Sequence, residues 1–197
     1  NRLYDVEKAT FKNVLDFYEN HAEFFADKKV FINSLPAHQL QGSDESAVLQ
    51  RLERHPDCIV GEYTEGSELE DSALLKRNEE YNALHVELAL DDYGSGYSNV
   101  NNLLRYTPRY VKIDQMLISG IQNDAQRRHF VKSIIDYAGK NNILVLAEGV
   151  ETMEELRTVI SLGVDLIQGF YTARPALEPM KEIPEDCEAM RQIIERD

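Results

Sequence analysis

Two adjacent aspartates, Asp91 and Asp92, end an apolar segment and directly precede a glycine-hinged loop over residues 93–96. Residues 85–90 (HVELAL) alternate in polarity and are rich in strand formers, which predicts a β-strand carrying both carboxylates at its C-terminal end. Adjacent like charges repel or raise each other's pKa, and a divalent cation removes that cost. The pair therefore indicates a metal site, and a turn that only caps the strand is the alternative interpretation.

The other predicted strands also end in polar residues of kinds that bind cations or transfer protons. These residues are Asn33, Glu62, Lys112 with Asp114, Glu148 and Gln168. Oxygen donors with one lysine, and neither histidine nor cysteine, favour magnesium, manganese or calcium over zinc. Two metals bridged by a carboxylate would suit phosphoryl chemistry, and the lysine could position or deprotonate a water or neutralise developing charge.

The segments that must position these residues alternate between strand and helix. Strands are predicted over 30–34, 58–63, 85–91, 110–114, 143–148 and 164–168, and helices over 7–25, 45–54, 68–82, 97–105, 124–140, 151–162 and 186–196. Such alternation predicts a parallel sheet, either open and doubly wound or closed as a (β/α) barrel of the TIM type. Glycine-rich nucleotide-binding patterns are absent. The polar strand ends favour the barrel, because its C-terminal strand ends converge on one mouth.

Composition excludes several classes of function. The 197 residues suffice for one large domain, and 43% hydrophobic content is ordinary for a globular core. A net charge of −14 argues against binding to a nucleic-acid polymer, although an anionic substrate remains compatible if cations bind first. No apolar run reaches membrane-spanning length. Two cysteines without metal-ligand spacing fit a reducing cytoplasm.

Six segments carry a resemblance to a known family. In chain order they are FINSLP (31–36), EYTE (62–65), DDYGSGYSN (91–99), VKID (111–114), AEGVET (147–152) and QGFYTARP (168–175). They resemble motifs of the EAL domain family, the cyclic di-GMP phosphodiesterases. The third resembles the family's DDFGTGYSS loop, the fifth matches its signature, and the sixth is similar to QGYYFSRP. The resemblance covers essentially the whole chain and implies magnesium- or manganese-dependent hydrolysis of cyclic di-GMP to linear pGpG.

The resemblance also implies roles for individual residues. Those that match the family's metal ligands are Asn33, Glu62, Asp91 and Asp92. Glu148 matches a further ligand or a holder of metal-bound water, and Lys112 matches the lysine that contacts the nucleophilic water. Glu65 resembles the glutamate that anchors the Asp-Asp loop, Glu151 a supporting carboxylate, and Gln168 a contact on the substrate side.

One departure from the family pattern concerns the start of the chain, which contains no Glu-Ala-Leu sequence. In the family, the glutamate of that motif is a metal ligand on the first strand, and a closed barrel has eight strands rather than six. We therefore expect residues 1–197 to be a single EAL-type domain that lacks its first strands and ends in a helix near 186–196. We expect this fragment to have impaired activity and to form a homodimer through exposed strand edges. We also expect the full-length protein to carry further signalling domains and to be cytoplasmic or anchored to the membrane through another domain.

Two other functions remain open on the sequence. The first is a receptor module that binds cyclic di-GMP without hydrolysing it. The second is another phosphodiesterase or sugar-phosphate enzyme on the same barrel. The complete set of Asp91, Asp92, Lys112 and Glu148 favours the enzyme, because a pure receptor has no need of a full metal and water site.

Overall fold

The computed structural model describes residues 2–26, 28–34, 40–55, 58–64, 79, 81, 83, 86–95, 103–104 and 108–177. Its strands are β1 (Val30–Asn33), β2 (Ile59–Thr64), β3 (Glu87–Tyr93), β4 (Tyr110–Ile113), β5 (Leu144–Ala147) and β6 (Leu166–Ile167). The helical segments are α1 (Arg2–Asn20), α2 (Ala22–Phe25), α3 (Gly42–Leu52), α6 (Gln115–Ile118), η2 (Ile121–Asn123), α7 (Ala125–Lys140) and α8 (Met153–Leu162).

The order of the strands in the sheet identifies the architecture. The six strands lie in the order β1-β2-β3-β4-β5-β6, and β1–β2, β2–β3, β4–β5 and β5–β6 pair in parallel. A doubly wound sheet reverses its strand order at a switch point, whereas a sequential order belongs to barrel-type winding. The predicted α/β fold of the (β/α) barrel type is therefore confirmed.

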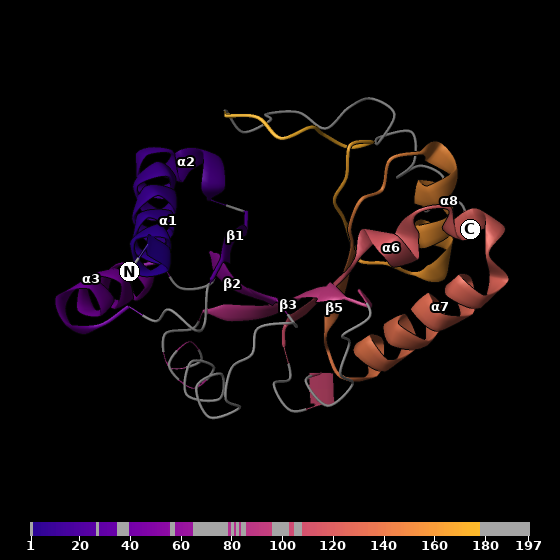
Figure 1. The fold of residues 1–197 in the computed structure, drawn as a ribbon, viewed down its shortest axis with the longest axis horizontal. Coiled ribbons are helices and arrows are strands. Elements are labelled where there is room, and N and C mark those ends of the chain that lie inside the picture. Colours follow the sequence, from indigo (N-terminus) through magenta and orange to yellow (C-terminus); the bar gives the residue numbers. More distant parts are fainter. Residues whose placement is uncertain are drawn as a thin grey trace. The chain divides into compact units, whose positions relative to one another are not determined.

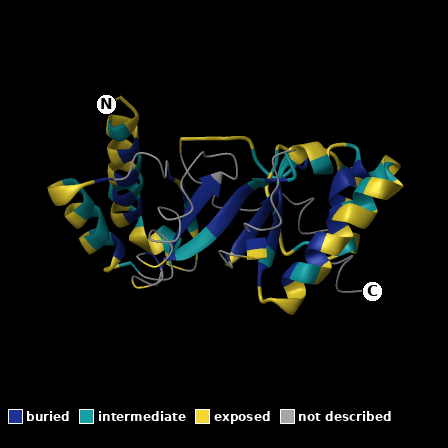
Figure 2. Ribbon diagram, turned by 60° about the horizontal axis from the view of Figure 1, so that its bottom comes forward, coloured by how far each residue is buried: buried dark blue, intermediate teal, exposed yellow. Residues whose placement is uncertain are grey.

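The chain divides into two compact units, and the first comprises residues 1–91 and 99–109. Helix α1 buries one stripe of side chains at helical spacing, which consists of Glu7, Phe11, Leu15 and Tyr18. The apolar members of that stripe share a core with Ile32 of β1 and with Ile59 and Tyr63 of β2. Helices of the structure accordingly show a buried face and an exposed face (Figure 2). This core holds β1 and β2 against α1.

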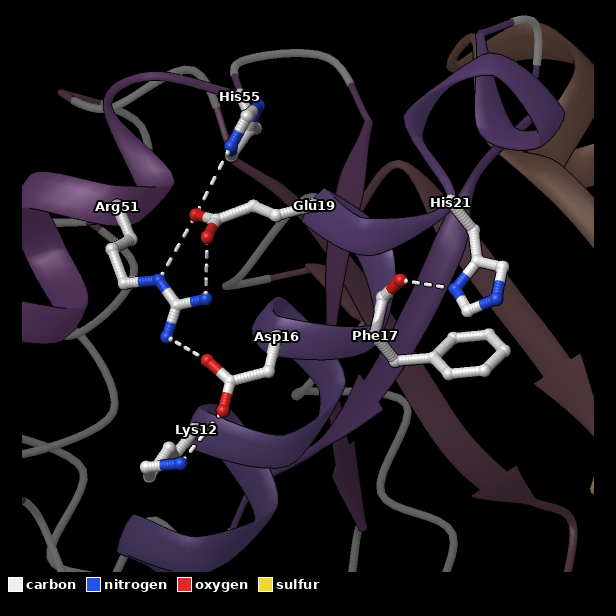
Figure 3. Close-up of polar contacts among 7 residues, drawn as sticks. All are labelled: Lys12, Asp16, Phe17, Glu19, His21, Arg51 and His55. Carbon is white, nitrogen blue, oxygen red and sulfur yellow. Dashed lines mark hydrogen bonds and ion pairs between the residues drawn. The ribbon is translucent and has the colours of Figure 1, made fainter.

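An ionic network on the surface of the first unit joins α1 to α3 (Figure 3). The guanidinium of Arg51 donates to both carboxylate oxygens of Glu19, at 3.0 and 2.9 Å, and forms an ion pair with Asp16 at 2.9 Å. Asp16 also pairs with Lys12 at 2.7 Å, and His55 Nε2 lies 3.3 Å from Glu19. The hydrogen bonds from Arg51 lower the pKa of Glu19, so the pair is charged at neutral pH.

The second unit comprises residues 92–98 and 110–197. The N-cap of helix α7 is Asp124, whose side chain accepts from the backbone N–H groups of Gln126 and Arg127. Helix α8 has a capping box between its N-cap, Thr152, and Glu155, and its C-cap is Gly163, which has φ 95°. The two helices pack against each other, and α7 packs against β5 (Figure 1).

Most predicted elements agree with the structure to within a few residues. The predicted helix over 7–25 is observed as two, because α1 ends at Asn20 and α2 begins after His21. The predicted segments 68–82 and 97–105 lie largely outside the described residues, and the C-terminal helix near 186–196 lies wholly outside them. Within the described part of the chain, no helix combines the length and the apolarity needed to cross a membrane.

Candidate functional site

The backbone of β3 brings both adjacent aspartates to one place. Successive side chains of a strand point to opposite faces, so Asp91 and Asp92 would normally diverge. Asp92 instead has φ 55°, a left-handed conformation that aspartate adopts more readily than most residues. This conformation interrupts the alternation, and one carboxylate oxygen each of Asp91, Asp92 and Glu148 lie within 4.8 Å of one another.

The chemistry of this acidic cluster fits a hard divalent cation. All three donors are carboxylate oxygens, the ligand type that magnesium, manganese and calcium prefer. Three carboxylates this close repel one another, and a bound cation would offset the repulsion. Asp91, Asp92 and Glu148 therefore form a group that could hold a metal ion.

Two further predicted ligands, Asn33 and Glu62, lie side by side in the first unit. Asn33 pairs with Glu62 in the register of β1 and β2, and Glu62 pairs with Ala89, two residues before Asp91, in the register of β2 and β3. Paired residues in parallel strands project to the same side, and so do residues two apart in one strand. Asn33, Glu62 and Asp91 consequently share one face of the sheet, the face opposite the core under α1.

Lys112 and Glu148 form an ion pair in the second unit, with Nζ and Oε1 2.9 Å apart. Lys112 lies in β4, in which every residue is buried, and is itself only 4% exposed. A buried ammonium group is costly unless it is paired and hydrogen-bonded, so this pair fixes the lysine side chain beside Glu148. The sequence prediction that Lys112 and Glu148 lie together is consistent with this geometry.

The loop after β5 is held on both sides by its neighbours. The backbone N–H of Glu148 donates to Ile113 of β4, and that of Val150 donates to Gln168 after β6. Gly149, between them, has φ 64°, a left-handed conformation suited to glycine. A Cβ at Gly169 would overlap the backbone of Val150. The segment after β6 therefore approaches the loop after β5 so closely that only glycine fits at position 169.

Glu155 is a residue of this region that the sequence predictions missed. Its Oε1 accepts from the N–H of Gly120 at 2.9 Å, and its Oε2 accepts from the N–H groups of Glu151 and Thr152 at 3.0 Å each. Burial raises the pKa of the Glu155 carboxyl, but these hydrogen bonds outweigh it and hold the pKa below its usual range. The T-x-x-E spacing of a capping box, Thr152 to Glu155, was the available signal.

A cavity of about 480 Å³ opens beside these residues in the second unit. Four predicted site residues line it, namely Asp92, Glu148, Glu151 and Gln168. Gln115 and Phe170 line it as well, although neither ends a strand in a way that the sequence pattern could detect. The remaining predicted residue, Glu65, lies outside the described residues.

Comparisons with known proteins identify the relatives of this chain. A family model described as EAL domain matches residues 4–175. A probable cyclic di-GMP phosphodiesterase of Escherichia coli K12, PdeN, is 33% identical over 156 residues, which are 79% of this chain and 27% of the relative. A second, PdeA of the same organism, is 28% identical over 73% of this chain and 20% of the relative. The chain thus spans about a quarter or less of the length of these relatives.

Two solved structures are similar in fold. A standalone EAL protein from Vibrio cholerae O395, in its c-di-GMP-bound form, superposes with a TM-score of 0.80 at 30% identity, over 93% of this chain and 78% of that chain. Klebsiella pneumoniae BlrP1, in a complex with manganese and cyclic di-GMP at pH 9.0, superposes with a TM-score of 0.77 at 28% identity. That match covers 87% of this chain and 45% of BlrP1.

Proposed function

Because the chain belongs to the EAL domain family, we propose that it forms the catalytic part of a phosphodiesterase that hydrolyses cyclic di-GMP to linear pGpG. The observation that carries this proposal is the acidic cluster of Asp91, Asp92 and Glu148, with Lys112 paired to Glu148. A receptor that only binds the dinucleotide needs no such combination of cation ligands and a buried lysine.

We propose magnesium or manganese as the cofactor, bound as two ions. Asp91, Asp92 and Glu148 supply ligands, and Asn33 and Glu62 are proposed as further ligands because they share a sheet face with Asp91. Such ions polarise the phosphodiester and lower the pKa of bound water. With a net charge of −14, the chain would need cations to bind a doubly negative dinucleotide.

Lys112 is the proposed catalytic cation of the chain itself. Its ammonium group is held by Glu148 at 2.9 Å inside a buried strand, so its position is fixed before substrate binds. A fixed positive charge in a poorly solvated site orients an attacking water and opposes the negative charge that develops on the phosphoryl oxygens. Glu148 has a second role here, since its carboxylate orients the lysine.

The cavity of about 480 Å³ is the proposed substrate site. Gln168 and Glu151 lie on its wall, where Gln168 can hydrogen-bond the dinucleotide and Glu151 can orient neighbouring groups. We propose that Glu65 anchors the loop after Asp92, as the family resemblance implies. Homodimer formation, attachment to further signalling domains and a cytoplasmic location stay predictions.

The test compares turnover with binding in a Lys112→Ala variant. With saturating manganese, we expect kcat for pGpG formation to fall on the order of 10²-fold or more, as for loss of other preorganised charges. The Kd for cyclic di-GMP should change far less, because the charge acts mainly on the transition state. Lys140→Ala removes an exposed lysine at the end of α7 and serves as the matched control.

Each other outcome has a definite meaning. Equal losses in turnover and in affinity would make Lys112 a phosphate anchor, and unchanged turnover would remove it from the mechanism. If the full-length protein that contains this chain binds cyclic di-GMP and manganese but forms no pGpG, the receptor function replaces the enzyme. Hydrolysis of other phosphodiesters in preference to cyclic di-GMP would indicate a different enzyme on the same fold.

A further inference from the structure

A buried carboxylate in the first unit has no role in the site described above. Glu7 lies on α1 in the same buried stripe as Phe11 and Leu15, and only 1% of it is exposed. Removing a carboxylate from water costs free energy that only hydrogen bonds or ion pairs can offset. An apolar residue at this position would pack against the core without that cost, so the carboxylate requires a reason beyond packing.

One partner of Glu7 is Ser34, the residue that directly follows β1. The hydroxyl of Ser34 donates to Oε1 of Glu7 at 2.8 Å, and the contact is buried. The backbone N–H of Ser34 donates to the carbonyl oxygen of Glu62 in β2 at 3.1 Å. Ser34 is therefore tied to α1 through its side chain and to β2 through its backbone.

The position of Ser34 determines the direction of its neighbour. Adjacent side chains in an extended segment point to opposite faces, so Ser34 faces α1 while Asn33 faces the side shared with Glu62. Any rotation or shift of the chain at Ser34 would move Asn33 relative to Glu62. A charge-assisted hydrogen bond to a buried carboxylate is among the stronger restraints that a single side chain provides.

We propose that Glu7 is a positioning residue for cation binding, which acts through Ser34 to orient Asn33 beside Glu62. This inference rests on the proposed function, because it takes Asn33 and Glu62 as cation ligands. It assigns a role to helix α1, which contributes no proposed ligand of its own. The group that touches the cation is Asn33, and Glu7 determines where Asn33 lies.

The experiment measures binding of Mn²⁺ alone, by isothermal titration calorimetry and by electron paramagnetic resonance, so it needs no substrate and no turnover. We expect Ser34→Ala and Glu7→Ala each to weaken Mn²⁺ binding about 10- to 100-fold, the usual effect of removing a partner that supports a ligand. The double variant should have about the same Mn²⁺ affinity as the single variant with the lower affinity, because both changes break the same Glu7–Ser34 hydrogen bond. Glu7→Gln keeps an acceptor oxygen and should recover most of the loss seen in Glu7→Ala.

The matched control is Phe11→Leu, which loosens the same buried face of α1 without touching Ser34. It should lower thermal stability and leave Mn²⁺ affinity unchanged in the folded protein. An equal loss of affinity in Phe11→Leu would show that general loosening of α1 explains the effect, and would overturn the inference. Independent losses that multiply in the double variant would also overturn it.

Asp92→Asn separates this inference from the proposed function. If Asp92→Asn weakens Mn²⁺ binding but Ser34→Ala and Glu7→Ala bind as the unmodified chain does, the cation site stands and the role of Glu7 is wrong. If Asp92→Asn leaves Mn²⁺ binding unchanged, the cation site itself is wrong, and the role of Glu7 falls with it. Should Glu7→Ala fail to fold, Ser34→Ala alone decides the question.

Discussion

Replacing Glu155 with glutamine would test how the loop between β5 and α8 is held in place. In the structure, one oxygen of Glu155 accepts from Gly120 and the other accepts from Glu151 and Thr152. Glutamine offers only one oxygen. If the glutamine oxygen keeps its hydrogen bonds with the N–H groups of Glu151 and Thr152, the glutamine NH₂ group faces the N–H of Gly120. Both of these groups are donors, so the N–H of Gly120 loses its acceptor.

The cost of Glu155→Gln follows from this count of hydrogen bonds. A buried N–H without an acceptor costs about 1–3 kcal/mol, and the two remaining bonds lose the strengthening that the charge gives them. We expect the free energy of unfolding at pH 7 to fall by about 2 kcal/mol. The loss should be measurable, because a domain of this kind has a total stability of about 5–15 kcal/mol.

The pH dependence gives the prediction a sign. The folded-state pKa of Glu155 lies below its ordinary value of 4.5, because hydrogen bonds to the charged form outweigh burial. Stability from this carboxylate is therefore fully present above the ordinary value and is lost as pH falls through the lower, folded-state pKa. The difference between the unmodified chain and Glu155→Gln should be largest near neutral pH and should shrink in acid.

Urea denaturation followed by circular dichroism, from pH 7 down to the most acidic pH at which the chain stays folded, measures this difference. Glu154→Gln is the matched control, since Glu154 is the exposed neighbour in the same helical turn. A difference below about 0.5 kcal/mol at pH 7, the level of ordinary surface substitutions, would refute the reasoning. A difference that grows as the pH falls would refute the assigned direction of the pKa.

Two other predictions concern the first unit. Arg51→Ala should lower the thermal midpoint by removing the ionic link between α1 and α3. The decrease should be smaller at about 1 M salt, because salt screens exposed ion pairs. Differential scanning calorimetry at low and high salt measures the decrease, and an equal decrease at the two salt concentrations would contradict the prediction. A hydrogen bond with the Cys58 side chain, burial and the electrostatic effect of Cys58 raise the pKa of Tyr18 to about 12, so the contribution of Tyr18 to stability is lost only as pH rises toward that value. An ultraviolet titration of the tyrosines should show this late transition, and Cys58→Ala should move it to lower pH.

The strand ends of the site were predictable from sequence because each one breaks a local pattern. Lys112 is a charge inside a strand whose other residues are apolar, and Asp91 and Asp92 are adjacent charges near the end of β3. Side chains alternate between the two faces of a strand, so a short stretch of sequence predicts which residues share one face of the sheet. The structure places Asp92, Glu148 and Gln168, which were predicted at strand ends, around one cavity, and Glu151, which the family resemblance indicated, lines the same cavity.

The long-range contacts that support the site were not predictable, because they join distant parts of the chain. Glu7 meets Ser34 across 27 positions, and Glu155 meets Gly120 across 35. Local patterns indicate only that Glu7 is a polar residue in an apolar helical stripe. The short helix α6 was missed for a different reason: it has four residues, too few for a helical period, although Asp114 caps it.

The left-handed backbone of Asp92 has a consequence for mutational scanning. An alanine at this position loses the carboxylate and must also adopt φ 55°, which costs about 1–2 kcal/mol for an ordinary L-residue. A scan that uses alanine alone would record these two effects as one number and would overstate the chemical role of the side chain. Asparagine removes the charge and tolerates the backbone, whereas glycine removes the side chain and favours the backbone. Together, these two substitutions separate what Asp92 binds from what its backbone requires.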